Sequence, residues 1–256
     1  MSSRTTGATC SARPAIDPVD LLRGLRRGAL AGLIGGAAAG AFGFLLAEPV
    51  MDRAVGLEAA RQTAAGEHHA EVFDRHTQHV GFLVATVATG LALGVLLGVL
   101  FTVLHRDDPD REPWRRSVGL GSAAWFGVYL VPFLRYPANP PGVGDPGTIG
   151  LRTHSYLSAL VLGIVGAVVA VLVARRLADR DVRPPVRQLA VTGVLIGTVA
   201  LTFVLPSSPD ALDVPAALLW EFRLLALATS TLLWGVLAAS YGLLGERSGA
   251  REPVTV

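Results

Sequence analysis

Four of the six histidines in this chain of 256 residues lie within twelve positions, at His68, His69, His76 and His79. If this stretch is helical, a turn of about 100° per residue puts the four imidazole rings on one face. His69 and His76 would then lie about 10 Å apart along the axis, too far to share an ion that needs ligand nitrogens at about 2 Å. His76 and His79, three residues apart, can approach the same ion. The pattern predicts metal or proton handling, and a solvated polar extension of a helix is the alternative interpretation.

Long apolar runs must position these residues, since hydrophobic residues make up 51% of the chain and charged residues 16%. Spanning a bilayer core of about 30 Å takes about 20 helical residues, with a range of about 17 to 25, and in lipid the backbone must satisfy its own polar groups. Six runs without a charged residue meet this length, at residues 28–47, 80–104, 117–134, 155–174, 189–205 and 224–244. The sequence therefore predicts an all-α integral membrane protein, a six-transmembrane-helix bundle embedded in the lipid bilayer.

The arginines are distributed unevenly between the two ends of these runs. Sixteen lie in the terminal segments and the even-numbered loops, and six lie in the odd-numbered loops. Because cytoplasmic loops carry the excess of basic residues, we expect both termini to be cytoplasmic, in a multi-pass protein of the cell (inner) membrane. Residues 1–20 are expected to form a disordered tail, 21–245 the transmembrane domain and 246–256 a cytoplasmic tail.

Glycines recur at every fourth position in the first two spans. Small residues at this spacing let helix backbones approach closely in lipid, so we expect these rows to face other helices. A glycine-lined permeation path is the alternative. The rows comprise Gly24, Gly28, Gly32, Gly36 and Gly40 in the first span and Gly90, Gly94 and Gly98 in the second.

Two loops that this topology makes external carry most of the remaining polar chemistry. The first contains the histidines. The second, residues 130–154, is rich in proline and glycine, which excludes a continuous helix, and it contains Asp145 and His154. A rigid connector is the simpler interpretation of this second loop, and a structured lid or re-entrant segment is the alternative.

A cation that sheds its water at a membrane entrance needs several replacement ligands, and no single segment supplies enough within reach. We therefore expect the two loops to come together, so that carboxylates and imidazoles complete one shell. The histidines of the first loop would capture the ion, and Glu48 and Asp52, one turn apart at the end of the first span, would pass it inward. A mobile collector without fixed geometry is the alternative. The candidate metal ligands are His68, His69, His76, His79, Glu48, Asp52, Asp145, His154 and Glu221.

The motifs of soluble enzymes are missing: there is no Walker A loop, GxSxG, HExxH or dinucleotide fingerprint in its context. Cys10 is the single cysteine, which excludes a disulfide framework and a thiolate metal site. No nucleic-acid partner is expected. Three functions fit the residues: a subunit for uptake of a divalent cation, a membrane-embedded metal-dependent hydrolase, and a non-transporting assembly subunit that senses metal or pH.

The string YPANPP at residues 136–141, followed by GDP at residues 144–146, resembles the signature loop of the CbtA family of predicted cobalt-transporter subunits. The resemblance covers most of the chain and carries over best onto Glu48, Asp52, Tyr136, Asn139 and Asp145.

The resemblance implies a transporter subunit rather than an enzyme, for uptake of a divalent transition metal linked to cobalamin supply. Cobalt is the implied cargo, with nickel or zinc as alternatives because imidazole suits all three. No permanently bound cofactor is implied. The implied partner is a small single-span histidine-bearing B subunit. Assembly of the chain into a homo-oligomer is a further possibility.

Overall fold

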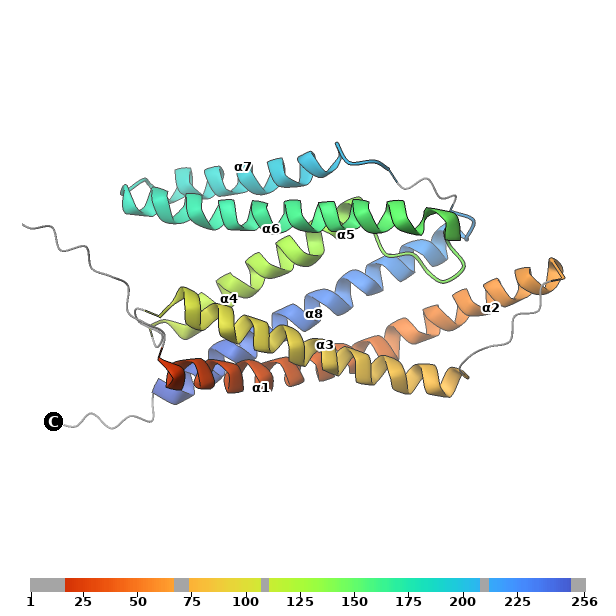
Figure 1. The fold of residues 1–256 in the computed structure, drawn as a ribbon, viewed down its shortest axis with the longest axis horizontal. Helices are drawn as coiled ribbons and strands as arrows, with labels where there is room; N and C mark the ends of the chain where they lie inside the picture. The colour runs from red at the N-terminus through yellow and green to blue at the C-terminus, as the bar shows by residue number, and fades with distance from the viewer. Residues whose placement is uncertain (1–16, 67–73, 107–110, 208–211, 250–256) are drawn as a thin grey trace, which may run out of the picture.

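The computed structural model describes residues 17–66, 74–106, 111–207 and 212–249, and within these ranges its regular structure is helical throughout (Figure 1). The elements in chain order are α1 Pro18–Phe42, η1 Gly43–Ala47, α2 Glu48–Ala64, α3 Arg75–Leu104, α4 Pro113–Ala124, η2 Trp125–Leu130, α5 Val131–Arg135, η3 Pro146–Thr148, α6 Ile149–Asp179, α7 Pro184–Thr202 and α8 Ala216–Gly249. Of these, η1 and η2 are π-helical and η3 is a short 3₁₀ turn.

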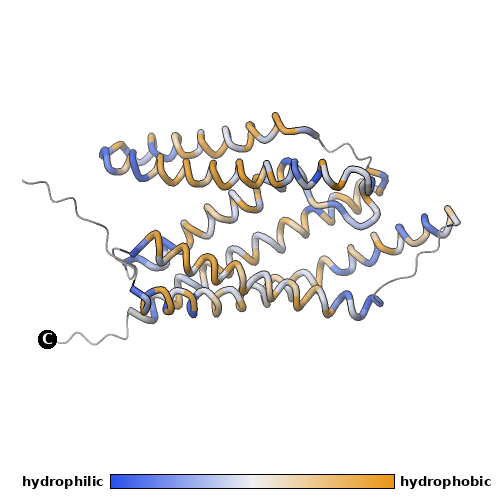
Figure 2. Tube along the Cα trace, viewed as in Figure 1, coloured by the Kyte–Doolittle hydropathy of each residue, from blue (hydrophilic) through white to orange (hydrophobic). Residues whose placement is uncertain are grey.

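Six helical segments in the described residues are long and apolar enough to cross a membrane, which confirms the predicted number of spans. Figure 2 shows apolar residues along the middle of the bundle and hydrophilic residues toward its ends. The segments are Pro18–Ala64, Arg75–Leu104, Pro113–Arg135, Ile149–Asp179, Pro184–Thr202 and Ala216–Arg247.

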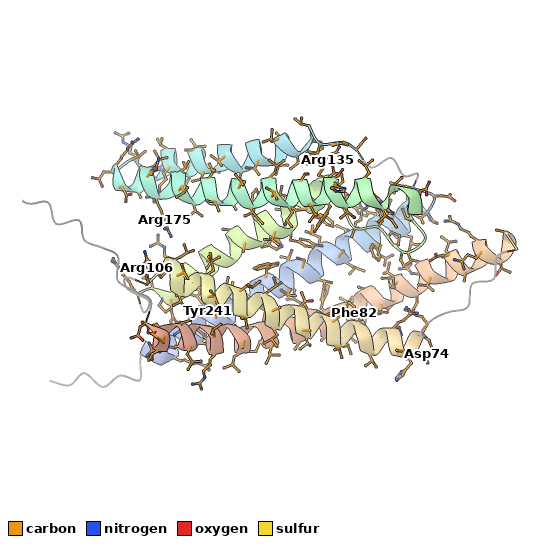
Figure 3. All side chains as sticks on the ribbon, viewed as in Figure 1. Asp74, Phe82, Arg106, Arg135, Arg175 and Tyr241 are labelled. Atoms are coloured by element: carbon orange, nitrogen blue, oxygen red, sulfur yellow. The ribbon has the colours of Figure 1, made fainter. Side chains whose placement is uncertain are left out.

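The bundle has two chemically different ends. The arginine-rich end is where α1 begins and α8 finishes, and Arg106 and Arg175 lie there (Figure 3). The opposite end, called the site end from here on, carries the end of α2 and the beginning of α3, where Asp74 lies (Figure 3). This separation agrees with the arginine asymmetry of the sequence, and the assignment of the arginine-rich end to the cytoplasm stays a prediction.

The helix of the first span does not end at Glu48-Pro49 as the sequence suggests, but continues through η1 into α2. Proline lacks an N–H and its ring clashes with the carbonyl four residues earlier in an α-helix. The π-helical segment Gly43–Ala47 ends two residues before Pro49 and accommodates it. The continuous 47-residue helix is about 70 Å long at about 1.5 Å per residue, so α2 extends beyond a bilayer core of about 30 Å.

The glycine rows of α1 and α3 face each other, which confirms the prediction of close helix packing. A Cβ built on Gly90 would lie 2.6 Å from the Cα of Gly36, and one built on Gly28 would overlap the carbonyl oxygen of Gly94. Backbone meets backbone along this contact, and a side chain at either row would force the helices apart.

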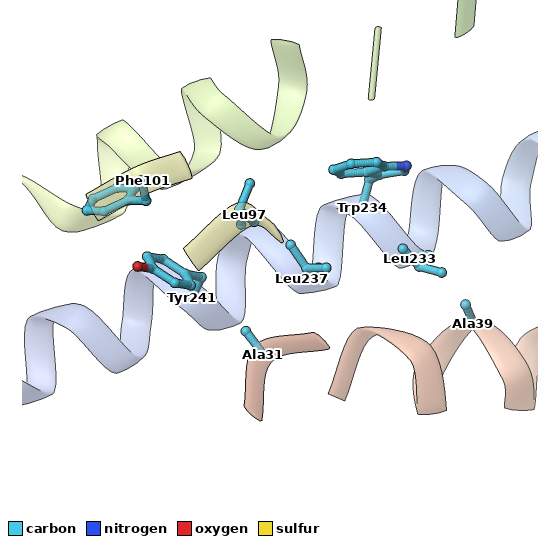
Figure 4. Close-up of a cluster of buried hydrophobic side chains, with 8 residues drawn as sticks. All are labelled: Ala31, Ala39, Leu97, Phe101, Leu233, Trp234, Leu237 and Tyr241. Carbon is cyan, nitrogen blue, oxygen red and sulfur yellow. The ribbon is translucent and has the colours of Figure 1, made fainter. Parts of the chain in front are cut away.

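Helix α8 packs beside this pair and completes the core toward the arginine-rich end. The Phe101 and Tyr241 rings lie 5.0 Å apart, and the Arg27 guanidinium stands 5.3 Å from the centre of the Tyr241 ring. Tyr241 is 1% exposed, so this part of the bundle is densely filled. The core cluster comprises Ala31, Ala39, Leu97, Phe101, Leu233, Trp234, Leu237 and Tyr241 (Figure 4).

The proline-rich loop after α5 has no regular structure from residue 136 to residue 145. Its Tyr136 hydroxyl donates to the carbonyl oxygen of Pro206 at 2.6 Å, and Arg223 of α8 donates to the amide oxygen of Asn139 at 2.8 Å. Gly142 and Gly144 adopt φ angles of 74° and 112°, which glycine tolerates best. These contacts hold the loop against α8 and the segment that follows α7.

Candidate metal centre

Three side chains that can bind a metal converge at the site end, from two different helices. They are Glu48 and Asp52 of α2 and His79 of α3, and one ligand atom from each lies within 4.8 Å of the others. His79 Nε2 stands 3.1 Å from Glu48 Oε2 and 3.7 Å from Asp52 Oδ1. In the described part of the chain, no other group of three such side chains meets this spacing.

Local helix geometry explains how these ligands reach one point. Glu48 and Asp52 lie four residues apart on α2 and therefore share a face. Asp74 caps α3 by accepting the backbone N–H of Thr77 at 2.9 Å. Hydrogen bonds from the side chain and then the backbone of Thr77 lower the pKa of the Asp74 carboxyl. His79 follows about one turn into α3, and the Phe44 ring contacts its imidazole edge-on at 5.8 Å.

Arg75 places a positive charge inside this cluster. Its Nη2 donates to Glu48 Oε2 at 3.0 Å, contacts Asp52 Oδ1 and lies 3.2 Å from His79 Nε2. Its Nη1 donates to the side-chain oxygen of Gln78 at 2.6 Å. Its Nε is buried without a hydrogen-bond partner. The guanidinium compensates part of the negative charge that the two carboxylates bring together.

A cavity of about 420 Å³ begins beside Glu48 and extends into the bundle. Glu48 lies at the boundary, 8% exposed, and lines this cavity as well as the ligand cluster. Most residues that line the cavity are apolar, including Trp234 of the core cluster, and five carry hydroxyl groups. The hydroxyl groups are those of Thr89, Tyr129, Tyr156, Thr229 and Ser230. Polar groups of this kind can replace part of the hydration of a cation along a path through a membrane.

The other predicted ligands lie elsewhere or outside the described residues. His68 and His69 are outside them, and His76 is exposed on α3. His76 joins no ligand group in the described chain.

The predicted ligands of the later segments have their own local contacts. Asp145 accepts the backbone N–H of Gly147 at 2.7 Å, and His154 Nδ1 lies 2.6 Å from the carbonyl oxygen of Gly150. Glu221 accepts a hydrogen bond from Arg53 at 2.6 Å. The three residues belong to no common ligand group in the described chain.

The sequence reasoning missed Arg75 as a member of the site and missed the hydroxyl groups of the cavity. Arg75 stands four residues before His79, a spacing that places two side chains on one helix face. Polar residues inside otherwise apolar spans, such as Thr89 and Thr229, were the available signal for the cavity, because intramembrane polar groups face the bundle interior.

A bundle of six helices long and apolar enough to cross a membrane defines a multi-pass membrane protein, and its carboxylate and imidazole side chains beside a cavity form a candidate metal site. The sequence of residues 22–246 matches the family model described as "Probable cobalt transporter subunit (CbtA)", and the chain belongs to this CbtA family. The resemblance recognised in the proline-rich loop is thereby confirmed. The family is one of transporter subunits, and the word subunit implies a partner in a complex. Comparison with curated proteins and with solved structures gave no match.

Proposed function

We propose that this chain captures a divalent transition-metal cation, cobalt in the first place, at Glu48, Asp52 and His79 and passes it into the cavity below. The observation that carries the proposal is the double position of Glu48, which belongs to the ligand cluster and lines the cavity of about 420 Å³. One carboxylate can therefore bind the ion at the entrance and face the interior at the same time.

The ligand chemistry supports a borderline metal ion. Two carboxylate oxygens and one imidazole nitrogen suit cobalt, nickel or zinc, and three protein ligands leave room for water in the remaining positions. The affinity of such a site for divalent metals follows the Irving–Williams order, which does not favour cobalt over nickel. Selection of cobalt would therefore depend on the geometry of the site or on the partner.

The core cluster supports the direction of the path. The cavity reaches Trp234, and beyond it lie the Phe101 and Tyr241 rings and the close contact of α1 with α3. This packing closes the cavity toward the arginine-rich end, while Glu48 at its other end lies beside the ligand cluster. Passage of an ion would require the bundle to open there, as in transporters that expose one side at a time.

We further propose that the site end is external, that uptake serves cobalamin supply, and that a small single-span histidine-bearing subunit is the partner. The arginine-rich end supports the first point through the positive-inside bias. The histidines before α3 would concentrate cations above the site, and a histidine-bearing partner would add imidazole ligands to a three-ligand shell.

Glu48→Gln tests the proposal, because it removes the carboxylate charge while keeping the size of the side chain. Cobalt binding to the purified full-length chain, measured by equilibrium dialysis, should weaken by about 10- to 100-fold or more. A loss of this size is typical when a residue that only hydrogen-bonds to a metal ligand is removed. Cobalt uptake by cells that produce the chain together with its partner subunit should fall in parallel.

Glu58→Gln is the matched control, since Glu58 is the same residue type on the same helix and hydrogen-bonds to Gln62 outside the ligand cluster. It should bind and take up cobalt like the wild type. Equal binding by Glu48→Gln and the wild type would exclude this site. Unchanged binding with metal-dependent hydrolysis and no uptake would instead favour an enzyme.

A further inference from the structure

One nitrogen atom of Arg75 occupies the position at which the three candidate ligands meet. Arg75 Nη2 lies against Glu48 Oε2, Asp52 Oδ1 and His79 Nε2, and these three atoms are the ones close enough to hold a metal ion. A guanidinium Nη carries two hydrogens, so it cannot donate a straight hydrogen bond to three acceptors at once. The arrangement is that of a cation among its ligands.

The His79 ring points to the same conclusion. Its Nε2 must accept if Arg75 donates to it, yet the same atom lies 3.1 Å from the acceptor Glu48 Oε2. One nitrogen cannot accept from Arg75 and donate to Glu48 together. The contact becomes favourable when a cation lies against both atoms, as the Arg75 guanidinium does in this structure.

We propose that Arg75 is a tethered substitute for the transported ion, which holds Glu48, Asp52 and His79 together between transport events and must leave before a divalent cation can bind. This inference rests on the proposed function and adds the step by which the site exchanges cations. The arginine and the metal exclude each other because both need the same three ligand atoms and both are positive.

The surroundings of Arg75 favour its release. The Nε atom is buried without a partner, so the bound position leaves one donor unsatisfied. The side chain is 28% exposed and begins at the first residue of α3, which leaves it a route to solvent. Nη1 donates to Gln78, one turn further along, and this contact can keep the displaced arginine near the entrance.

The other arginine pairs at this end differ. Arg53 contacts the single carboxylate of Glu221 with both side chains about half exposed, and Arg61 stands 3.6 Å from the exposed Asp213. Arg75 alone among the described arginines joins carboxylates that also belong to a metal-ligand group. Return of its side chain would push a bound ion from Glu48 toward the cavity.

Arg75→Gln tests the exchange in the purified full-length chain, by isothermal titration with cobalt chloride. If Arg75 occupies the ligands about 90–99% of the time, its removal should strengthen cobalt binding about 10- to 100-fold, because affinity scales with the fraction of competent sites. Arg75→Lys keeps a tethered cation and should stay near the wild-type affinity. Arg53→Gln, which removes a cation at the same end but outside the ligand group, should bind cobalt as the wild type does.

Addition of a free guanidinium gives a second readout that a structural salt bridge would not produce. Millimolar methylguanidinium should weaken cobalt binding to Arg75→Ala, because it re-enters the vacated position, and should leave the wild type unaffected. In the wild type, cobalt should accelerate modification of Arg75 by phenylglyoxal, mapped by peptide mass spectrometry. This measurement needs no substitution at position 75 and stands even where the variants fold poorly.

Unchanged or weaker cobalt binding by Arg75→Gln would overturn the exchange and make Arg75 a fixed structural partner of the acids. Phenylglyoxal modification that cobalt does not accelerate would overturn it as well. The proposed function fails separately, when the wild type binds no cobalt or when Glu48→Gln binds it equally well.

Discussion

A methyl group added to the contact between α1 and α3 should destabilise the bundle by an amount that the structure predicts. In Gly94→Ala, the new Cβ would lie 2.6 Å from the Cα and 2.8 Å from the backbone nitrogen of Gly32. Carbon atoms prefer separations of about 3.5–4.0 Å, so the two backbones must move apart by about 1 Å. No side chain can rotate away, because the contacted atoms belong to the main chain.

Separation by this distance removes dispersion energy along the whole contact. A gap of about 0.5–1 Å forfeits a quarter to a half of the interaction of each lining atom pair, and overpacking of this kind costs about 1–3 kcal/mol. For a chain of this size, each 1 kcal/mol lowers the melting temperature by about 2–4 °C. Gly94→Ala should therefore melt about 2–12 °C below a glycine-to-alanine variant whose new methyl group meets no neighbour, because the gain in helix propensity is common to both.

Thermal unfolding of the detergent-solubilised protein, followed by tryptophan fluorescence, measures this difference. Gly193→Ala is the matched control, because it makes the same substitution in a membrane helix where a Cβ would meet nothing within 4 Å. The control should melt at or slightly above the wild-type temperature, since alanine favours helix over glycine by about 1 kcal/mol. Equal melting temperatures for the two variants would refute the argument that the glycine rows set the distance between α1 and α3.

Two further predictions concern orientation and pH. In a cysteine-free background, an impermeant maleimide added outside intact cells should label Ala65→Cys at the site end and leave Asp179→Cys unlabelled; labelling of Asp179→Cys would reverse the topology. Burial lowers the pKa of His105 below its ordinary value of 6.5, so its neutral form is favoured in the fold. The stability this provides is fully present above pH 6.5 and is lost as the pH falls through the lowered pKa. His105→Gln should therefore flatten the acid side of a melting-temperature profile, and an unchanged profile would contradict this role.

The six spans and the glycine contact could be predicted because each depends on local pattern. Apolar length determines which segments cross the bilayer, and a four-residue glycine period marks the face on which two helices can touch. Glu48 and Asp52 were recognised as a pair for the same reason, since four residues make about one turn. The continuity of the helix from α1 into α2 could not be predicted from the sequence. Pro49 indicates the end of a helix, and the π-helical segment that accommodates this proline has no simple sequence pattern.

Which residues make up the site could not be predicted from short stretches of sequence, because it depends on how the helices face one another. Counting along the chain favoured His76 with His79, three residues apart. In the structure the face of α3 turned toward α2 carries Arg75 and His79, four residues apart, and His76 is exposed. Which face of a helix meets its neighbour is decided by the register of α1 against α3, and the glycine contact fixes that register further along the two helices. The ligand role of His76 stays a prediction.

The position of the candidate site follows from where this close packing stops. From Gly28 to Gly36, the glycine row of α1 meets α3 through backbone atoms, which leaves no space for an ion between the helices. At Gly40 the nearest atoms are side-chain carbons of Leu83 and Thr86 at 3.5 Å or more, and at Gly43 the neighbour is the Phe82 ring. Side chains thus replace backbone contact as the helices approach the site end. A long polar side chain can lie between helices only where they are separated in this way, and Glu48 comes about one turn after that change, beside the cavity. The glycine rows that close one half of the bundle therefore also determine where the candidate site can form in the other half.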